Sequence, residues 1–227
     1  MTDGEADDEL TLSAYRADSS ELFPRILDLH IDDGARIADV THGTGVFLQD
    51  IDLEARDMEL VTSDITAKTG DLSMVGDCRV LPLQDNSLDC MILDPPYAEG
   101  FYRRNKDHMA GHGSHESFRD TYSGAREYEG AGRYHSAVLH TYFEGGKEAK
   151  RVLRDDGMLI IKIMDEVSSN TQELAHIQVT NYYERELGFC TRDLFIQVRK
   201  ERPTVVGMNK QVHARKNHSY FLIYDMP

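Results

Sequence analysis

Short runs of apolar residues alternate with stretches of helical periodicity along most of the chain. Continuous apolar runs are typical of strands buried on both faces, and their alternation with helices is typical of a parallel sheet between two helical layers. The pattern therefore predicts an α/β fold. Strands are expected at 35–41, 59–65, 88–93, 158–164, 191–198 and 219–224, and helices at 19–31, 46–56, 136–153 and 171–187.

Capping residues mark the ends of two of these helices. Gly188 is expected to stop the helix 171–187, because glycine readily adopts the left-handed conformation that ends helices. At the start of the first helix, Asp18 and Glu21 have the spacing of a capping box, whereas Pro24 favours a start one turn later, as the first helical residue. The pattern leaves both starts open.

One domain accounts for most of the chain. Residues 1–18 are expected to form an acidic tail and residues 19–227 a single domain, because no second segment has the apolar pattern of its own core. The segment 98–135 interrupts the alternation, since it is rich in Gly, His, Tyr and Arg without a sustained apolar period. Long connections of this kind are usually either functional or disordered.

A glycine turn follows the first strand of the predicted sheet, in the stretch Asp39-Val40-Thr41-His42-Gly43-Thr44-Gly45. Two glycines let the backbone turn tightly and approach a ligand closely. A dinucleotide fingerprint would need a third glycine where Leu48 stands, so the turn favours a nucleoside-type cofactor over NAD. Asp64 ends the next strand, 19 residues after Gly45, where a carboxylate reaches ribose hydroxyls. Its alternative role is that of a turn residue.

Two further acidic positions follow at later strands. Asp77 precedes the third strand region and is a candidate acceptor for an adenine amino group, although Asp is also common in turns. Asp94-Pro95-Pro96-Tyr97 follows the apolar run 88–93, at the end of a strand where open α/β sheets bind ligands. The prolines stiffen the backbone, so that carbonyl and carboxylate acceptors and an aromatic ring are held together. This set suits a planar base with an exocyclic amino group.

Together these motifs resemble the amino-methyltransferases that modify adenine N6 or cytosine N4 in nucleic acids. In that family a glycine-rich cofactor motif precedes a catalytic D/N/S-P-P-Y/F/W motif on a Rossmann-like sheet of seven mostly parallel strands. Here Asp39-Val40-Thr41 stands where the family usually has Asp-Pro-Phe, and a large target-recognition domain is lacking. The resemblance implies S-adenosylmethionine as the cofactor, held by Phe23, Pro24, Asp39, Thr41, Gly43, Gly45, Asp64, Asp77 and Cys78.

The resemblance also implies a catalytic role for Asp94, Pro95, Pro96 and Tyr97. Asp94 and the Pro95 carbonyl would accept hydrogen bonds from the target amino group, and Tyr97 would stack on the base. The expected substrate is adenine N6 in DNA, with the base turned out of the duplex. Cytosine N4, or a base in RNA or tRNA, is an alternative target. A catalytically silent nucleic-acid-binding subunit is the non-enzymatic alternative.

Charge is distributed unevenly for a protein expected to bind a polyanion. The net charge is −15, and residues 1–33 carry ten acidic side chains against Arg16 and Arg25. Residues 197–220 carry six basic side chains against Glu201 alone. Phosphate contacts are therefore expected from this segment and from the insertion, at Arg103, Arg104, Lys210, Arg215 and Lys216.

Other classes of site and location are not indicated by the sequence. Cys78, Cys90 and Cys190 are too widely spaced for a zinc site, so no metal is expected. The acidic N-terminus lacks the order of a signal peptide, and no apolar run reaches the roughly 18 residues of a membrane span. The protein is therefore expected to be cytoplasmic and to have no membrane partner.

Overall fold

A twisted sheet of eight strands forms the centre of the part of the molecule that the computed structural model describes, which comprises residues 10–66, 70, 72–98, 134–201 and 211–226. Its strand order is β1-β9-β10-β6-β5-β2-β3-β4. The strands are β1 (Ala14–Arg16), β2 (Arg36–Asp39), β3 (Glu59–Asp64), β4 (Met74–Val75), β5 (Leu88–Leu93), β6 (Leu153–Ile163), β9 (Cys190–Val198) and β10 (His218–Asp225).

The five strands from β4 to β6 are parallel to one another. β10 is antiparallel to both β6 and β9, and β9 pairs with β1 in parallel. A separate hairpin joins β7 (Glu166–Ser168) to β8 (Thr171–Glu173). The predicted α/β class and mostly parallel sheet are thus confirmed.

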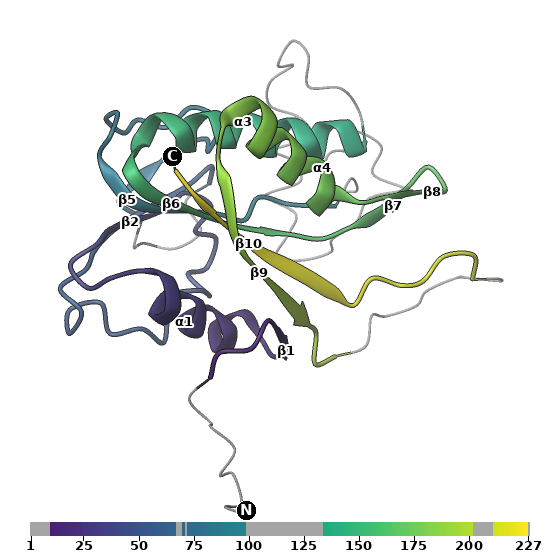
Figure 1. Ribbon diagram of the computed structural model, residues 1–227, viewed down its shortest axis with the longest axis horizontal. Helices are drawn as coiled ribbons and strands as arrows, with labels where there is room; N and C mark the ends of the chain where they lie inside the picture. Colours follow the sequence, from purple (N-terminus) through teal and green to yellow (C-terminus); the bar gives the residue numbers. More distant parts are fainter. Residues whose placement is uncertain (1–9, 67–69, 71, 99–133, 202–210, 227) are drawn as a thin grey trace, which may run out of the picture.

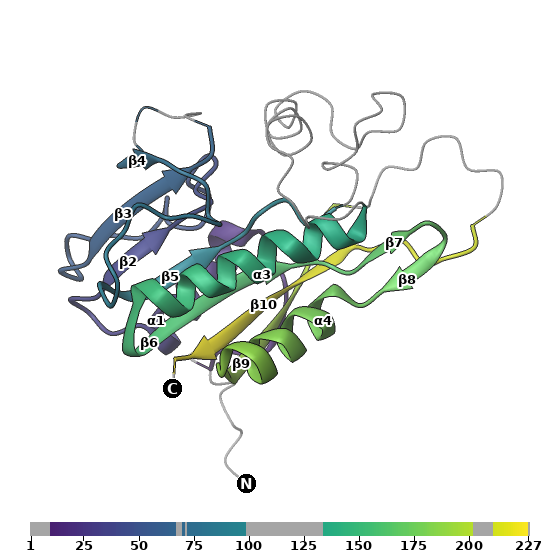
Figure 2. The ribbon, with the colours of Figure 1, turned by 90° about the horizontal axis from the view of Figure 1, so that it is seen from above.

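Helices cover both faces of the sheet (Figures 1 and 2). The first, α1 (Ser19–His30), packs on one face, and α3 (His135–Val152) and α4 (Ala175–Tyr182) pack on the other. One strand shows why both layers are needed: Leu159 and Ile161 of β6 belong to the core under α3, whereas Met158 and Ile160 belong to the core under α1. Adjacent strand residues point to opposite faces, so a run that is apolar throughout must be covered twice.

Several elements lie where the apolar pattern predicted them. β5 has the predicted bounds, and β10 and β9 extend the predicted strands by one or two residues. Gly188 ends the helical stretch with a φ of 84°, which is the left-handed conformation expected of it. The first helix begins at Ser19, with the Glu21 carboxylate accepting from the Asp18 N–H at 2.9 Å, so the start favoured by Pro24 was wrong.

The helix predicted at 46–56 was also wrong, because the chain forms successive turns there. Single hydrogen bonds, such as Leu48 N–H to the Gly45 carbonyl at 3.2 Å, replace a helical ladder. Phe47 and Leu48 are buried in the core under α1, and the Asp52 carboxylate accepts from the Ala55 N–H at 3.0 Å. Packing and side-chain capping satisfy this segment without a helix, although its apolar spacing is helical.

Two other segments differ from the prediction. Within the expected acidic tail, Ala14–Arg16 forms β1, an eighth strand beside the seven expected, because it finds backbone partners on β9 and the Arg16 guanidinium donates to the Lys200 carbonyl. The helix expected at 171–187 instead begins as β8, continues as α4 and ends in one π-helical turn, Tyr183–Leu187. The interior of the 98–135 insertion lies outside the described residues.

Candidate functional site

The predicted site residues meet at one edge of the sheet, where the parallel strands β2, β3 and β5 end. Asp39 is the last residue of β2, Asp64 is the last residue of β3, and Asp94 follows β5 directly. Because neighbouring parallel strands end at the same edge, their terminal side chains and the loops that follow them lie together. β6 ends at this edge too and brings Lys162 beside Asp94.

The glycine turn has the backbone conformation that its glycines predicted. Gly43 has a φ of 59° and Gly45 a φ of 76°, a region that residues with a Cβ rarely adopt. A Cβ on Gly45 would also lie 3.0 Å from Nε2 of His42. The turn therefore depends on glycine at this position both for its conformation and for the space that the imidazole occupies.

Asp64 joins the glycine turn to the end of β3. One carboxylate oxygen accepts from the Gly43 N–H at 2.9 Å, and the other accepts from the Thr66 N–H at 3.0 Å. The residue is only 3% exposed. The Thr66 hydroxyl also donates, at 3.4 Å, to the oxygen that accepts from the Thr66 N–H. The oxygen bound to the Gly43 N–H keeps a further lone pair, so the carboxylate holds the turn in place and still has acceptor capacity for a hydroxyl.

Asp39 and His42 form a buried polar pair beneath the turn, which the sequence did not single out. Nδ1 of His42 lies 3.0 Å from Oδ2 of Asp39, and the Thr41 N–H donates to Oδ1 at 3.3 Å. Burial raises the pKa of the Asp39 carboxyl, an effect that the bond to His42 opposes. The close i, i+3 spacing of the two residues is the only signal in the sequence.

Thr41 connects the glycine turn to the Asp94 motif. Its hydroxyl oxygen accepts from the Asp94 N–H at 2.6 Å. The family that these motifs resemble usually has phenylalanine here, and a phenylalanine side chain has no acceptor for this bond. The departure from the family pattern therefore has a structural function, since Thr41 positions the backbone of the residue expected to be catalytic.

Asp94 is a carboxylate with one buried and unsatisfied oxygen. Among the described residues, Oδ1 has no hydrogen-bond partner, and Oδ2 lies 3.9 Å from Nζ of Lys162. Burial raises the pKa of Asp94 to about 7, although Lys162 opposes the shift and Asp39 adds to it. A buried acceptor without a partner costs free energy, which a donor from a ligand would recover.

The other members of the Asp94 motif are held from two sides. The Tyr142 hydroxyl of α3 donates to the Lys162 carbonyl at 2.6 Å and lies 3.5 Å from the Pro95 carbonyl. The Tyr97 ring packs against the core under α3, and its hydroxyl accepts from the Arg199 guanidinium at 3.4 Å. Arg199 follows β9, so an exposed basic side chain lies beside the Tyr97 ring.

Of the four remaining positions proposed for the cofactor, Pro24 lies inside helix α1, and the other three already have structural roles. Phe23 is fully buried and stacks on Phe47 with ring centroids 5.0 Å apart. The Asp77 carboxylate receives two hydrogen bonds from the Arg79 guanidinium, at 2.9 and 2.7 Å. Burial raises the pKa of the Cys78 thiol to about 12, so this side chain is a neutral apolar group.

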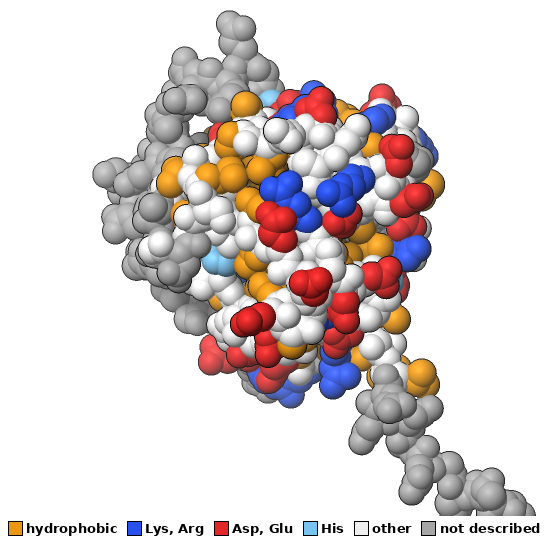
Figure 3. All heavy atoms as spheres, turned by 90° about the vertical axis from the view of Figure 1, so that its left-hand side faces the viewer, with side chains coloured by type: hydrophobic (Ala, Val, Ile, Leu, Met, Phe, Trp, Pro, Cys, Tyr) orange, Lys and Arg blue, Asp and Glu red, His pale blue; other side chains and the backbone are white. Residues whose placement is uncertain are grey.

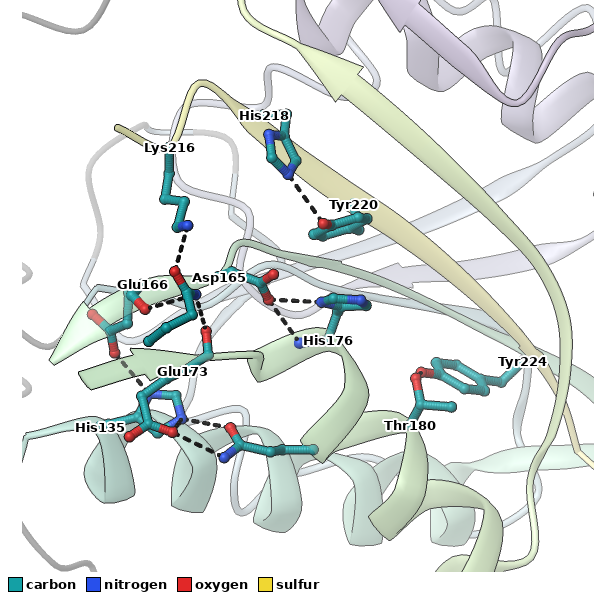
Figure 4. Close-up of polar contacts among 12 residues, drawn as sticks. His135, Asp165, Glu166, Glu173, His176, Thr180, Lys216, His218, Tyr220 and Tyr224 are labelled. Carbon is teal, nitrogen blue, oxygen red and sulfur yellow. Dashed lines mark hydrogen bonds and ion pairs between the residues drawn. The ribbon is translucent and has the colours of Figure 1, made fainter. Parts of the chain in front are cut away.

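The predicted phosphate-binding residues are described only in part. Arg103, Arg104 and Lys210 lie outside the described residues. Arg215 is exposed, and the Lys216 ammonium donates to the Gln172 side chain of the β8 hairpin at 2.5 Å (Figure 4). Figure 3 shows the left-hand side of the molecule in Figure 1, where acidic and basic side chains are interspersed.

A second polar cluster lies beside Lys216 and was not singled out from the sequence. His176 bonds to Asp165 at 2.7 Å and stacks on the Tyr220 ring, with centroids 4.1 Å apart. His218 bonds to the Tyr220 hydroxyl at 3.0 Å (Figure 4). Within the described part of the chain, no group of three or more His, Cys, Asp or Glu is arranged to hold a metal ion, and no helix there has the length and apolarity of a membrane span.

Solved structures with a similar fold come from several organisms, although no family model and no curated protein sequence matches this chain. TrmN from Thermus thermophilus has a TM-score of 0.50 and 14% identity over 91% of this chain, which spans 48% of TrmN. The PH0226 protein of Pyrococcus horikoshii has a TM-score of 0.49 and 16% identity, over 92% of this chain and 89% of that one. A SAM-dependent methyltransferase from Aquifex aeolicus has a TM-score of 0.48 and 11% identity, over 92% and 94%. The chain thus has a Rossmann-like α/β fold similar to that of TrmN, with a mostly parallel sheet between helices.

Proposed function

We propose that this protein transfers a methyl group from S-adenosylmethionine to an exocyclic amino group of a nucleic-acid base, and that the base is adenine in DNA. The observation that carries the proposal is Oδ1 of Asp94, which is buried at the carboxyl edge of the sheet next to the glycine turn and has no hydrogen-bond partner among the described residues. A buried acceptor at the ligand-binding edge calls for a donor from a substrate. An exocyclic amino group supplies one.

The residues at the glycine turn fit a nucleoside cofactor. Gly43 and Gly45 let the backbone approach the ligand, and the buried Asp64 carboxylate provides acceptors for ribose hydroxyls. Asp77 would accept from the adenine amino group, provided that it shares its carboxylate between that group and Arg79. The bound cofactor supplies an electrophilic sulfonium methyl group.

Asp94 and the Pro95 carbonyl act on the target nitrogen. Hydrogen bonds to these acceptors draw the amino group out of conjugation with the ring and localise its lone pair. The nitrogen would then take the methyl group that the cofactor supplies, with S-adenosylhomocysteine as the leaving group, and the surplus proton would leave to water. Tyr97 stacks on the base and holds it in line, so positioning and electrostatics contribute most of the rate.

A nucleoside analysis tests this proposal directly. The protein is incubated with S-adenosylmethionine labelled on its methyl group and with double-stranded DNA, single-stranded DNA or tRNA, and the products are digested to nucleosides. We expect label in N6-methyldeoxyadenosine from DNA. Label in N4-methyldeoxycytidine or in a tRNA nucleoside would correct the substrate, and no transfer to any nucleic acid would contradict the proposal.

The basic segment before β10 is expected to bind the phosphate backbone. Replacing Arg215 and Lys216 together by glutamine should weaken DNA binding and reduce its log–log salt slope by nearly two units, about 0.9 for each duplex phosphate that is no longer neutralised. Fluorescence anisotropy at several salt concentrations measures both. In the control variant, Lys147 of α3 and Arg154, near the start of β6, are both replaced by glutamine. This double substitution changes the net charge by the same amount. An unchanged slope in the Arg215 and Lys216 variant would place the DNA on another surface.

A further inference from the structure

Lys162 is a basic side chain enclosed in the interior, close to the site but not part of its motifs. It interrupts the apolar run of β6, and its side chain is only 12% exposed. Its ammonium lies 5.4 Å from the centre of the Phe47 ring and 5.6 Å from that of Phe221. Lysine side chains are mostly exposed in proteins, so one this little exposed is expected to have partners for its charge.

A buried network of polar side chains holds the ammonium in place. Nζ donates to the Ser19 hydroxyl at 2.9 Å, and Ser19 is bonded in turn to the Gln197 side chain of β9. Gln197 is anchored by the Ala17 carbonyl at 3.0 Å and by the Ser219 hydroxyl of β10 at 3.2 Å. The charge therefore has a fixed position relative to the sheet, set by four elements of the fold.

The fixed charge faces Asp94. Nζ lies 3.9 Å from Oδ2 of Asp94, whose Oδ1 is the acceptor without a partner in the part of the chain that the structure describes. The other charged group that acts on Asp94 is Asp39 of β2, which is itself paired with His42. On the α3 side, the Tyr142 hydroxyl donates to the Lys162 carbonyl. Lys162 is thus the cation that opposes both burial and the charge of Asp39.

We propose that Lys162 is a positioning residue for methyl transfer, whose ammonium keeps the Asp94 carboxylate ionised so that it accepts from the target amino group. This inference rests on the proposed function of Asp94. A protonated carboxyl group carries a donor that competes with the amino group, whereas a carboxylate only accepts. Because the pKa of Asp94 lies near 7 even with Lys162 present, removing the cation raises it further and protonates Asp94 at neutral pH.

The experiment compares Lys162→Met and Lys162→Gln with the wild type. In the wild type, kcat/KM should fall on the acid side with an apparent pKa near 7, since the ionised form of Asp94 is the active one. In both variants this acid limb of the profile should move to higher pH by about a unit, so that kcat/KM at pH 7 falls about fivefold and largely recovers at pH 9. Lys147→Met, an exposed lysine on α3, is the matched control and should leave the profile unchanged.

A second measurement does not depend on catalysis. The Asp94 carboxyl is followed by carbon-13 NMR during a pH titration of the protein without cofactor, with Asp94→Asn assigning the signal. An upward shift of its pKa in either Lys162 variant supports the proposal. The proposal would be overturned if the pH profile of kcat/KM and the Asp94 titration both matched those of the wild type. It would also be overturned if the KM for S-adenosylmethionine rose without a shift of the pH profile, since Lys162 would then be a cofactor ligand.

The two measurements separate this inference from the proposed function. If the titration shifts but the wild type transfers no methyl group to any nucleic acid, the proposed function fails and the catalytic part of this inference fails with it. Thermal unfolding identifies variants that fold. Lys162→Gln retains a donor for Ser19, so it keeps the test possible if Lys162→Met is unstable.

Discussion

Replacing Asp94 by asparagine is expected to lower kcat by at least about 100-fold while leaving the affinity for S-adenosylmethionine nearly unchanged. Asparagine has the size of aspartate but presents one amide oxygen and one amino group in place of two acceptors. Its oxygen is uncharged and its amino group repels a donor. Within the described residues, Asp94 has no hydrogen bond or ion pair to Gly43, Gly45 or Asp64, so the cofactor side of the site should be preserved.

Single-turnover transfer of labelled methyl groups measures the effect on chemistry, and calorimetry measures cofactor binding. Asp155→Asn is the matched control, because Asp155 is an exposed aspartate on β6 at the opposite edge of the sheet. It should retain wild-type activity. An Asp94→Asn variant with near wild-type turnover would show that the buried carboxylate is not the acceptor for the target amino group.

The second large effect is expected at Asp64, on the cofactor side. Replacing Asp64 by alanine should weaken S-adenosylmethionine binding by about 1–3 kcal/mol, which is the range for the loss of charge-assisted hydrogen bonds. Two causes act together, because the substitution removes the acceptors proposed for the ribose and also frees the Gly43 and Thr66 N–H groups that the carboxylate holds. The dissociation constant should therefore rise by about 5- to 150-fold.

Calorimetry with S-adenosylmethionine and S-adenosylhomocysteine measures this change. Glu59→Gln serves as the control, since Glu59 is an exposed carboxylate at the other end of the same strand. S-adenosylhomocysteine should lose as much affinity as the methyl donor, because both contain the ribose. Unchanged affinity for both would leave Asp64 the purely structural role of joining the turn to β3.

The apolar pattern was sufficient to predict six of the eight strands of the sheet, all except β1 and β4. Leu88–Leu93 is apolar along nearly its whole length, and only a strand covered on both faces buries such a run. The same pattern was insufficient at 46–56, because apolar spacing alone does not tell a helix from a chain of turns that buries Phe47 and Leu48. It also missed β1, which exists only because β9 provides an edge for three residues.

By itself the sequence determined the α/β class and the order of the motifs, because burial patterns and glycine turns are local properties. It also placed Asp39, Asp64 and Asp94 at strand ends, and parallel pairing then brought them to one edge. Only the tertiary structure decided the contacts between those motifs. The Asp94 N–H donates to the Thr41 hydroxyl, the Gly43 N–H donates to the Asp64 carboxylate, and the Lys162 ammonium lies beside the Asp94 carboxylate. These pairs are 21 to 68 residues apart, and side-chain electrostatics act through space, so no local pattern records them.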